Sequence, residues 1–205
     1  MYINNKYINL VPGWGKYFYT WWVKHKNIEY PEFIKEYHPK MELIVWGSHQ
    51  PVLLHMLNTI KDGRVIEFGM GYNSTPLLSI ICKAQGRKLI SMDNSDKYLI
   101  CFRKFRHPMI KFTDDNVQYP EGKFSLALVD AHPAHLRQEF INNMKGRVDY
   151  FIVHDTENLL KGMECPYGYD FDGFRFAFHF KRVHPMTSVI SDLPEINEKI
   201  LTIFE

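Results

Sequence analysis

The chain has 205 residues, of which 45% are apolar and 23% charged, and its formal net charge is +2. A chain of this length buries a core without disulfides or metal staples, and its composition excludes disordered, collagen-like and coiled-coil proteins. The small positive charge by itself gives no argument for nucleic acid as a partner.

The cysteines are few and widely spaced. Cys82, Cys101 and Cys165 form no CxxC pair, which indicates free thiols in a reducing compartment and neither a disulfide framework nor a zinc site. The first residues lack the apolar stretch of a secretory signal, and no run approaches the roughly 18 apolar residues of a membrane span. We therefore expect a cytoplasmic protein with no membrane-spanning segment.

A segment of two candidate helices precedes the first predicted strand. We expect residues 1–45 to form an N-terminal helical cap on a domain that spans residues 46–205. Phe, Tyr and Trp make up 15% of the chain and gather at residues 14–22 and 167–180. Such clusters are typical of a packed core, but they also suit a ring-lined pocket for a sugar or aromatic acceptor. Both interpretations stay open.

Short apolar runs then alternate with segments of helical spacing. The runs that predict strands are 64–68, 88–92, 109–112, 124–129 and 149–153, and the predicted helices are 52–60, 75–84, 96–105 and 134–144. This alternation predicts an α/β fold with a doubly wound parallel sheet. Phenylalanines at every second position of 174–180, followed by a returning run at 187–190, predict an antiparallel hairpin at one edge.

The strongest local motif follows the first predicted strand. Glu67 ends the strand, Gly69 and Gly71 follow, and a helix begins near Ser74. Glycines allow a tight turn and a close approach of the backbone to a ligand. Asp93 ends the next strand, where a carboxylate accepts hydrogen bonds from ribose hydroxyls. A merely structural turn with an exposed Asp93 is the alternative.

These residues resemble the signature of class I S-adenosylmethionine-dependent methyltransferases, Glu/Asp-x-Gly-x-Gly with an acid ending the second strand. The resemblance covers residues 47–192. It implies a Rossmann-like seven-stranded sheet, mostly parallel, whose last strand is antiparallel. It also implies that S-adenosylmethionine is the cofactor. The expected cofactor-binding residues are His49, Glu67, Gly69, Gly71, Tyr72, Asn73, Ser74, Asp93, Asn94 and Asp115.

Within this set the resemblance assigns separate roles. Gly69 and Gly71 line the methionine part, and Glu67 supports the loop or contacts the amino group. Asp93 holds the ribose, and Asp115 or its neighbour Asp114 lies near the adenine. The third glycine of the family is replaced here by Asn73 or Ser74.

Two further strands end in acids. Asp130 follows the fourth predicted strand and Asp155 the fifth, so both should face the ligand edge of the sheet. This stretch is similar to small-molecule and sugar O-methyltransferases that bind magnesium between such acids. It implies a metal site at Asp130, His154 and Asp155, although the second acid of the usual pair is missing. A metal-free site, in which the two acids orient the substrate, is the alternative.

Histidines crowd the same strand ends. His132 lies two positions after Asp130 and has a reference pKa near neutrality, so we predict it as the general base. His135 and His154 are the other histidines there. The expected catalytic residues are therefore His132, Asp130 and Asp155.

The sequence thus predicts an O-methyltransferase for a sugar, glycan or other small hydroxyl-bearing acceptor, assisted by a divalent ion, with no DNA or RNA partner. A homodimer is a further expectation. Scarce Ala beside abundant Lys, Asn, Ile, Phe and Tyr suggests an AT-rich source, such as a large DNA virus with a glycan methyltransferase. An NAD(P)-dependent oxidoreductase would share the glycine loop, and a nucleic-acid methyltransferase would use the basic run of residues 97–111. A non-catalytic cofactor-binding scaffold is a third alternative.

Overall fold

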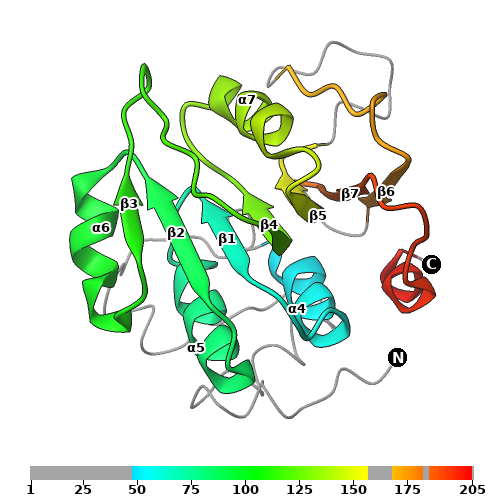
Figure 1. Cartoon of the computed structure of the whole chain (residues 1–205), viewed down its shortest axis with the longest axis horizontal. Coiled ribbons are helices and arrows are strands. Elements are labelled where there is room, and N and C mark those ends of the chain that lie inside the picture. The colour runs from blue at the N-terminus through cyan, green and yellow to red at the C-terminus, as the bar shows by residue number, and fades with distance from the viewer. Residues whose placement is uncertain (1–47, 157–167, 182–184, 205) are drawn as a thin grey trace.

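The computed structural model of the protein describes residues 48–156, 168–181 and 185–204 (Figure 1). The predicted N-terminal cap, residues 1–45, lies outside this part and stays a prediction, as does the placement of Cys165. None of the helices in the described part is long and apolar enough to cross a membrane.

A seven-stranded sheet in the order β3-β2-β1-β4-β5-β7-β6 forms the centre of the fold. The strands are β1 (Val65–Phe68), β2 (Leu89–Asp93), β3 (Met109–Lys111), β4 (Phe124–Val129), β5 (Val148–His154), β6 (Phe176–Phe180) and β7 (Thr187–Ser191). The first five strands run parallel, and β7 is antiparallel to both β5 and β6. The predicted α/β fold, with its antiparallel last strand, is confirmed.

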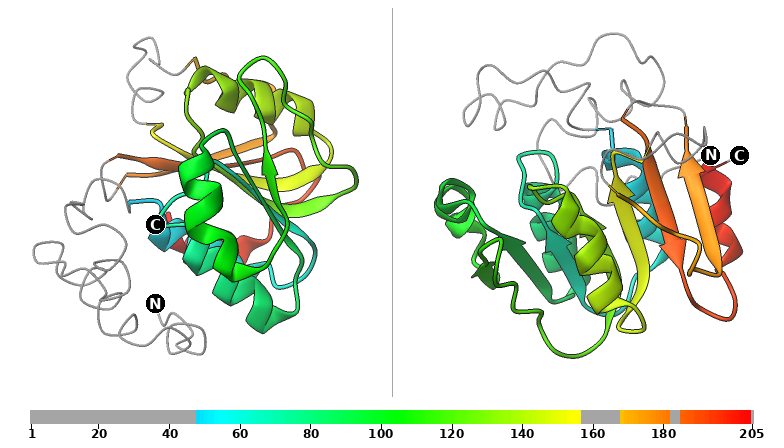
Figure 2. Two further views of the ribbon diagram at one scale, coloured as in Figure 1. Left: turned by 90° about the vertical axis from the view of Figure 1, so that its left-hand side faces the viewer. Right: turned by 90° about the horizontal axis from the view of Figure 1, so that it is seen from above.

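Helices cover both faces of the sheet, as the view from above shows (Figure 2). They are α4 (Gln50–Thr59), α5 (Thr75–Gln85), α6 (Asp96–Phe102), α7 (His135–Met144) and the 3-10 helices η2 (Arg103–Phe105) and η4 (Glu198–Ile203). On one face α4, α5 and η4 pack together, and on the other face α7 packs against the strands. The sequence did not predict η4, although its Ile200 and Ile203 are buried.

Successive side chains of each strand point to opposite faces of the sheet, and this alternation divides the apolar core into two clusters, one on each face. In β4, Leu126 and Leu128 join the cluster under α4 and α5, whereas Ala127 and Val129 join the cluster under α7. This period of two places the parallel strands between two apolar layers. Their carboxyl ends therefore meet at one edge, where the loops after β1, β2, β4 and β5 come together.

The loop after β1 crosses the end of β4 at close range. The backbone N–H of Asp130 donates to the carbonyl of Phe68 at 2.8 Å, and Gly69 has a φ of +97°. A Cβ atom at Gly69 would lie 2.4 Å from backbone atoms of Asp130 and Ala131. The crossing therefore requires glycine both for its dihedral angle and for space.

Replacing Gly69 should destabilise the fold far more than replacing another left-handed glycine. Gly69→Ala should lower the free energy of unfolding by about 3 kcal/mol or more, because backbone strain and overlap add. Gly86 has a φ of +69° but no atom within 4 Å of an added Cβ, so Gly86→Ala should cost about 1 kcal/mol. Urea unfolding followed by circular dichroism measures both. Equal stability of the two variants would contradict the close crossing.

Candidate active site

A cavity of about 480 Å³ opens at the carboxyl ends of the parallel strands. Its volume is within the usual range for small-molecule sites. It brings together most of the residues predicted from the sequence: His49, Gly71, Tyr72, Asn73, Ser74, Asp93, Asn94, Asp130, His132, His154 and Asp155. Glu67, Gly69 and Asp115 do not line it.

Asp93 connects two of the loops around the cavity. Its Oδ2 accepts the backbone N–H of Met70 at 2.7 Å, and its Oδ1 accepts that of Ser95 at 2.7 Å. Burial raises the pKa of Asp93, and these two hydrogen bonds partly oppose the shift. Each carboxylate oxygen retains a second lone pair, so Asp93 can still accept a donor from a ligand in the cavity.

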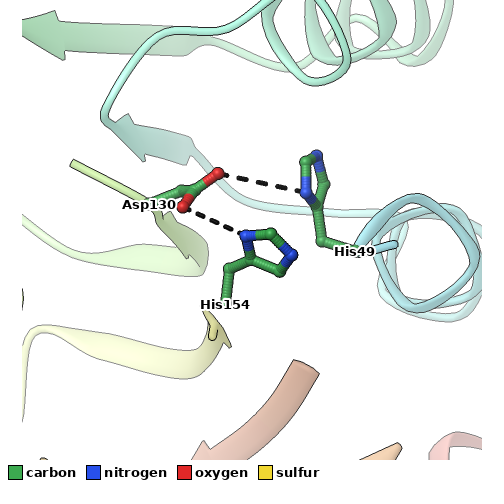
Figure 3. Close-up of side chains that lie close together, drawn as sticks. All are labelled: His49, Asp130 and His154. Carbon is green, nitrogen blue, oxygen red and sulfur yellow. Dashed lines mark hydrogen bonds and ion pairs between the residues drawn. The ribbon is translucent and has the colours of Figure 1, made fainter. Parts of the chain in front are cut away.

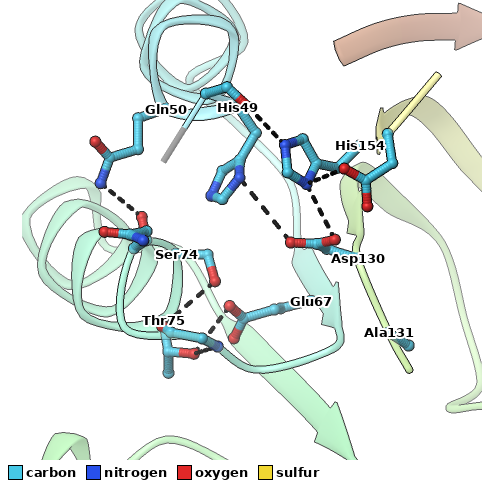
Figure 4. A network of polar contacts seen from close by, with 12 residues as sticks. His49, Gln50, Glu67, Ser74, Thr75, Asp130, Ala131 and His154 are labelled. Carbon is cyan, nitrogen blue, oxygen red and sulfur yellow. Dashed lines mark hydrogen bonds and ion pairs between the residues drawn. The ribbon is translucent and has the colours of Figure 1, made fainter. Parts of the chain in front are cut away.

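Glu67 is fully buried beneath the glycine loop (Figure 4). Its carboxylate accepts the hydroxyl of Thr75 at 2.9 Å and that of Ser91 at 2.6 Å, and Thr75 in turn accepts the N–H of Gly71 at 3.0 Å. Burial raises the pKa of Glu67 to about 7. Of the two roles that the resemblance offered, the geometry favours support of the loop.

Gly69 and Gly71 serve the loop in different ways. The backbone crossing requires Gly69, whereas a Cβ atom at Gly71 would meet only the hydroxyl of Ser74, at 3.4 Å. The fold therefore does not demand glycine at 71, the position that lines the cavity. Gln50 holds the same loop to α4 through a hydrogen bond to the Asn73 carbonyl at 2.9 Å.

Neither acid after β3 lines the cavity, but Asp114, unlike Asp115, is hydrogen-bonded to a residue of the lining, Asn94. Asn94 donates to Asp114 Oδ1 at 3.0 Å and to the carbonyl of His132 at 2.9 Å, which links the ends of β2 and β4. Asp115 is exposed and lies outside the cavity lining. Since two adjacent acids follow β3, only the observed turn distinguishes them.

Arg137, which the sequence analysis did not single out, joins the two acids at the ends of β4 and β5. This buried guanidinium on α7 contacts Asp130 Oδ1 at 3.0 Å and Asp155 Oδ2 at 2.8 Å, and it donates to the carbonyl of Ala131 at 2.7 Å. Only its position seven residues after Asp130, in the first turn of a helix, could have pointed to it. An exposed Arg at that place has the same sequence pattern.

The predicted metal ligands Asp130, His154 and Asp155 do not suit one divalent ion held between the two carboxylates. Arg137 already places a positive charge against both carboxylates, so an ion between them would face a buried cation at short range. Arg137 therefore offsets part of the negative charge of both acids. No metal-dependent step is therefore built on this set.

Asp130 forms a tight pair with His154 (Figure 3). His154 Nδ1 lies 3.1 Å from Asp130 Oδ1, and its Nε2 lies 2.7 Å from the hydroxyl of Ser48. Burial alone would lower the pKa of His154, but the negative charges of Asp130 and Asp155 raise it above its ordinary value. Burial by itself would raise the pKa of Asp130, but the neighbouring His154 and Arg137 hold this pKa at about 2.

The other histidines lie in different surroundings. Burial and the neighbouring His154 lower the pKa of His49 to about 3, so its imidazole is neutral. His132 is exposed and lines the cavity, whereas His135 is exposed and does not line it. Histidines that look alike in the sequence therefore differ in their burial and in the groups that surround them.

Part of the second aromatic cluster reaches the site. The hydroxyl of Tyr169 donates to the carbonyl of His154 at 2.8 Å and accepts from Arg137 at 3.1 Å. Phe171 and Phe174 instead pack in the core under α7. The first cluster, residues 14–22, lies outside the described residues.

Comparison with known proteins identifies the fold. No protein-family model matches the chain, and no curated protein matches it in sequence. An O-methyltransferase from Bacillus cereus, solved in complex with SAH, is 13% identical with a TM-score of 0.54, over 86% of this chain and 96% of that one. A candidate O-methyltransferase from Klebsiella pneumoniae is 10% identical with a TM-score of 0.59, over 84% and 94%. At this identity the likeness establishes a shared Rossmann-like fold.

The titration of Glu67 should give stability a measurable pH dependence. Between about pH 4.5 and pH 7 the folded chain keeps a proton that the unfolded chain has released, so stability falls as pH rises through this window. The full effect is up to about 3 kcal/mol, at about 1.4 kcal/mol per pKa unit. Glu67→Gln removes this titration.

Urea unfolding of both proteins at several pH values isolates the effect. The wild-type stability minus that of Glu67→Gln should decrease from about pH 5 to pH 7 and then level off. Taking the difference removes the contributions of the histidines, which both proteins share. A difference that stays constant over this range would refute the raised pKa.

Proposed function

We propose that the protein is an S-adenosylmethionine-dependent methyltransferase that methylates a hydroxyl oxygen of a small acceptor, with a sugar or glycan as the preferred class. One observation carries the proposal. The glycine loop and Asp93 share a single cavity with the charged cluster of Asp130, His154 and Asp155. A donor bound at the first group would lie beside an acceptor bound at the second.

The cofactor half of the cavity suits a nucleoside with a charged tail. Asp93 offers carboxylate oxygens for ribose hydroxyls, and Gly71 allows close approach at the open side of the loop. Tyr72 and Tyr98 add ring surfaces to the lining. When bound, S-adenosylmethionine supplies a methyl group on a positively charged sulfur. The residues around it only need to align the acceptor and remove its proton.

His132 is the residue best placed to take that proton. Both ring nitrogens of His154 already have partners, Asp130 and Ser48, and the burial of His49 makes it a weak base. His132 lines the cavity from its exposed rim, where its imidazole can reach an acceptor hydroxyl. Asp130 and Asp155 supply fixed negative charge beside the acceptor.

The sugar preference rests on the polar character of this half of the cavity. Charged and hydrogen-bonding groups of Asp130, His132, Arg137 and Asp155 line it, as a polyhydroxyl acceptor requires. The basic run that a nucleic-acid methyltransferase would use lies elsewhere. Lys104, Arg106 and His107 border a separate cavity that shares no lining residue with this one. Cytoplasmic location and a homodimer stay predictions.

Cofactor binding is the first test of this proposal. Calorimetry should detect binding of S-adenosylhomocysteine and no comparable binding of NAD. Asp93→Ala should weaken it by roughly 1.5–3 kcal/mol, the scale of hydrogen bonds to a charged group. Asp115→Ala removes an exposed acid outside the cavity lining and serves as the matched control, with nearly unchanged affinity. Preferential binding of NAD would favour the oxidoreductase instead.

The general base is tested by transfer of a labelled methyl group to a panel of mono- and oligosaccharides. His132→Ala should lower the rate by roughly 10²- to 10⁴-fold with unchanged cofactor affinity. His135→Ala, which removes a nearby exposed histidine outside the cavity lining, should leave the rate nearly unchanged. Full activity of His132→Ala would place the base elsewhere.

A further inference from the structure

Both ring nitrogens of His49 lie in the interior of the site without a hydrogen-bond partner among the described residues. The side chain lies at the start of α4 and is 2% exposed. The carbonyl of Asn73 is near the ring but does not meet hydrogen-bond geometry. Buried polar groups are almost always satisfied, so this ring needs a partner that the described residues do not supply.

Two other ligand-type side chains converge on the same point (Figure 3). Ligand atoms of His49, Asp130 and His154 all lie within 4.8 Å of one another, and His49 Nδ1 is 4.0 Å from Asp130 Oδ2. That separation is too long for a hydrogen bond. Two ligands of one ion, each about 2.1 Å from it, lie roughly 3 to 4 Å apart. The 4.0 Å separation of His49 Nδ1 and Asp130 Oδ2 therefore suits an ion between these two side chains better than a direct contact.

The surrounding contacts orient these ligands (Figure 4). The hydroxyl of Ser48 engages His154 Nε2 at 2.7 Å, which turns Nδ1 toward Asp130. Metal-binding histidines commonly have their second nitrogen held in this way. Arg137 engages Asp130 Oδ1, so Oδ2 is left on the side of His49.

We propose that His49, Asp130 and His154 bind a divalent transition-metal ion such as Zn²⁺. Two imidazoles and one carboxylate favour a d-block ion over Mg²⁺, which prefers oxygen ligands. The ion replaces the proton shared by His154 and Asp130. All three residues line the cavity, so the remaining coordination positions are open to a ligand there. This set differs from the carboxylate pair because it uses Asp130 Oδ2 on the side of His49, whereas Arg137 contacts Asp130 Oδ1 and Asp155.

Metal binding by the full chain, stripped with chelator, tests the site. Equilibrium dialysis with Zn²⁺, and visible absorption with Co²⁺, should show about one tightly bound ion per chain and only weak binding of Mg²⁺. His49→Ala should weaken Zn²⁺ binding by more than about 100-fold, and Ser48→Ala by about 10-fold, the scale for an outer-shell partner.

Two control variants distinguish this site from other metal binding. His135→Ala removes an exposed histidine and should leave the affinity unchanged. Asp155→Asn should weaken binding by no more than about 10-fold, because this side chain is not itself a ligand and acts as an outer-shell neighbour of His154 and Arg137. Far-ultraviolet circular dichroism and urea unfolding of the same samples report whether each variant is folded. If His49→Ala fails this check, His49→Gln replaces it.

The proposal is overturned if the wild-type chain binds no stoichiometric ion. It is also overturned if folded His49→Ala or His49→Gln keeps the full affinity for Zn²⁺. A loss of Zn²⁺ binding in Asp155→Asn as large as that in His49→Ala would overturn it as well. The inference does not rest on the proposed methyl transfer. A wild-type chain that binds Zn²⁺ but not S-adenosylhomocysteine would refute the proposed function and leave the ion site standing.

Discussion

The guanidinium of Arg137 holds the carboxyl ends of β4 and β5 together, and the geometry of the cavity depends on it. It contacts the carboxylates of Asp130 and Asp155 and the carbonyls at the ends of both strands. Two half-buried acids on neighbouring strands would otherwise repel one another, and each would lose part of its hydration. Because one buried cation offsets both effects, the acids can face the same cavity without an ion between them.

The second constraint is the backbone crossing at Gly69. The crossing brings the loop after β1 into contact with the backbone of Asp130, and this contact keeps the glycine loop beside the charged cluster. Asp93 reinforces this arrangement by binding the amide of Met70 from the end of β2. The proposed donor and acceptor halves of the cavity are therefore adjacent because of backbone contacts.

The sequence predicted what depends on local patterns. Periods of two and 3.6 gave the strands and helices, and the run of residues 174–180 gave the edge hairpin, because each signal lies within one element. The glycine loop and Asp93 were found for the same reason. Arg137 could not be found in this way, since its partners lie on two strands far apart in the sequence and an exposed arginine has the same pattern. The choice between Asp114 and Asp115 likewise depends on a turn that the sequence leaves open.

The histidines show why residue type alone does not assign a role. His49, His132 and His154 all lie at the ligand edge of the sheet, and the sequence ranks them only by position, such as that of His132 two residues after Asp130. In the structure one is buried and neutral with a pKa of about 3, one is buried and paired with Asp130, and one is exposed at the rim. The proposed ion site uses a lone pair of the neutral, buried His49, and the proposed general base is the exposed His132. Desolvation and neighbouring charge differ over a few ångströms, so three copies of one side chain acquire different chemical properties.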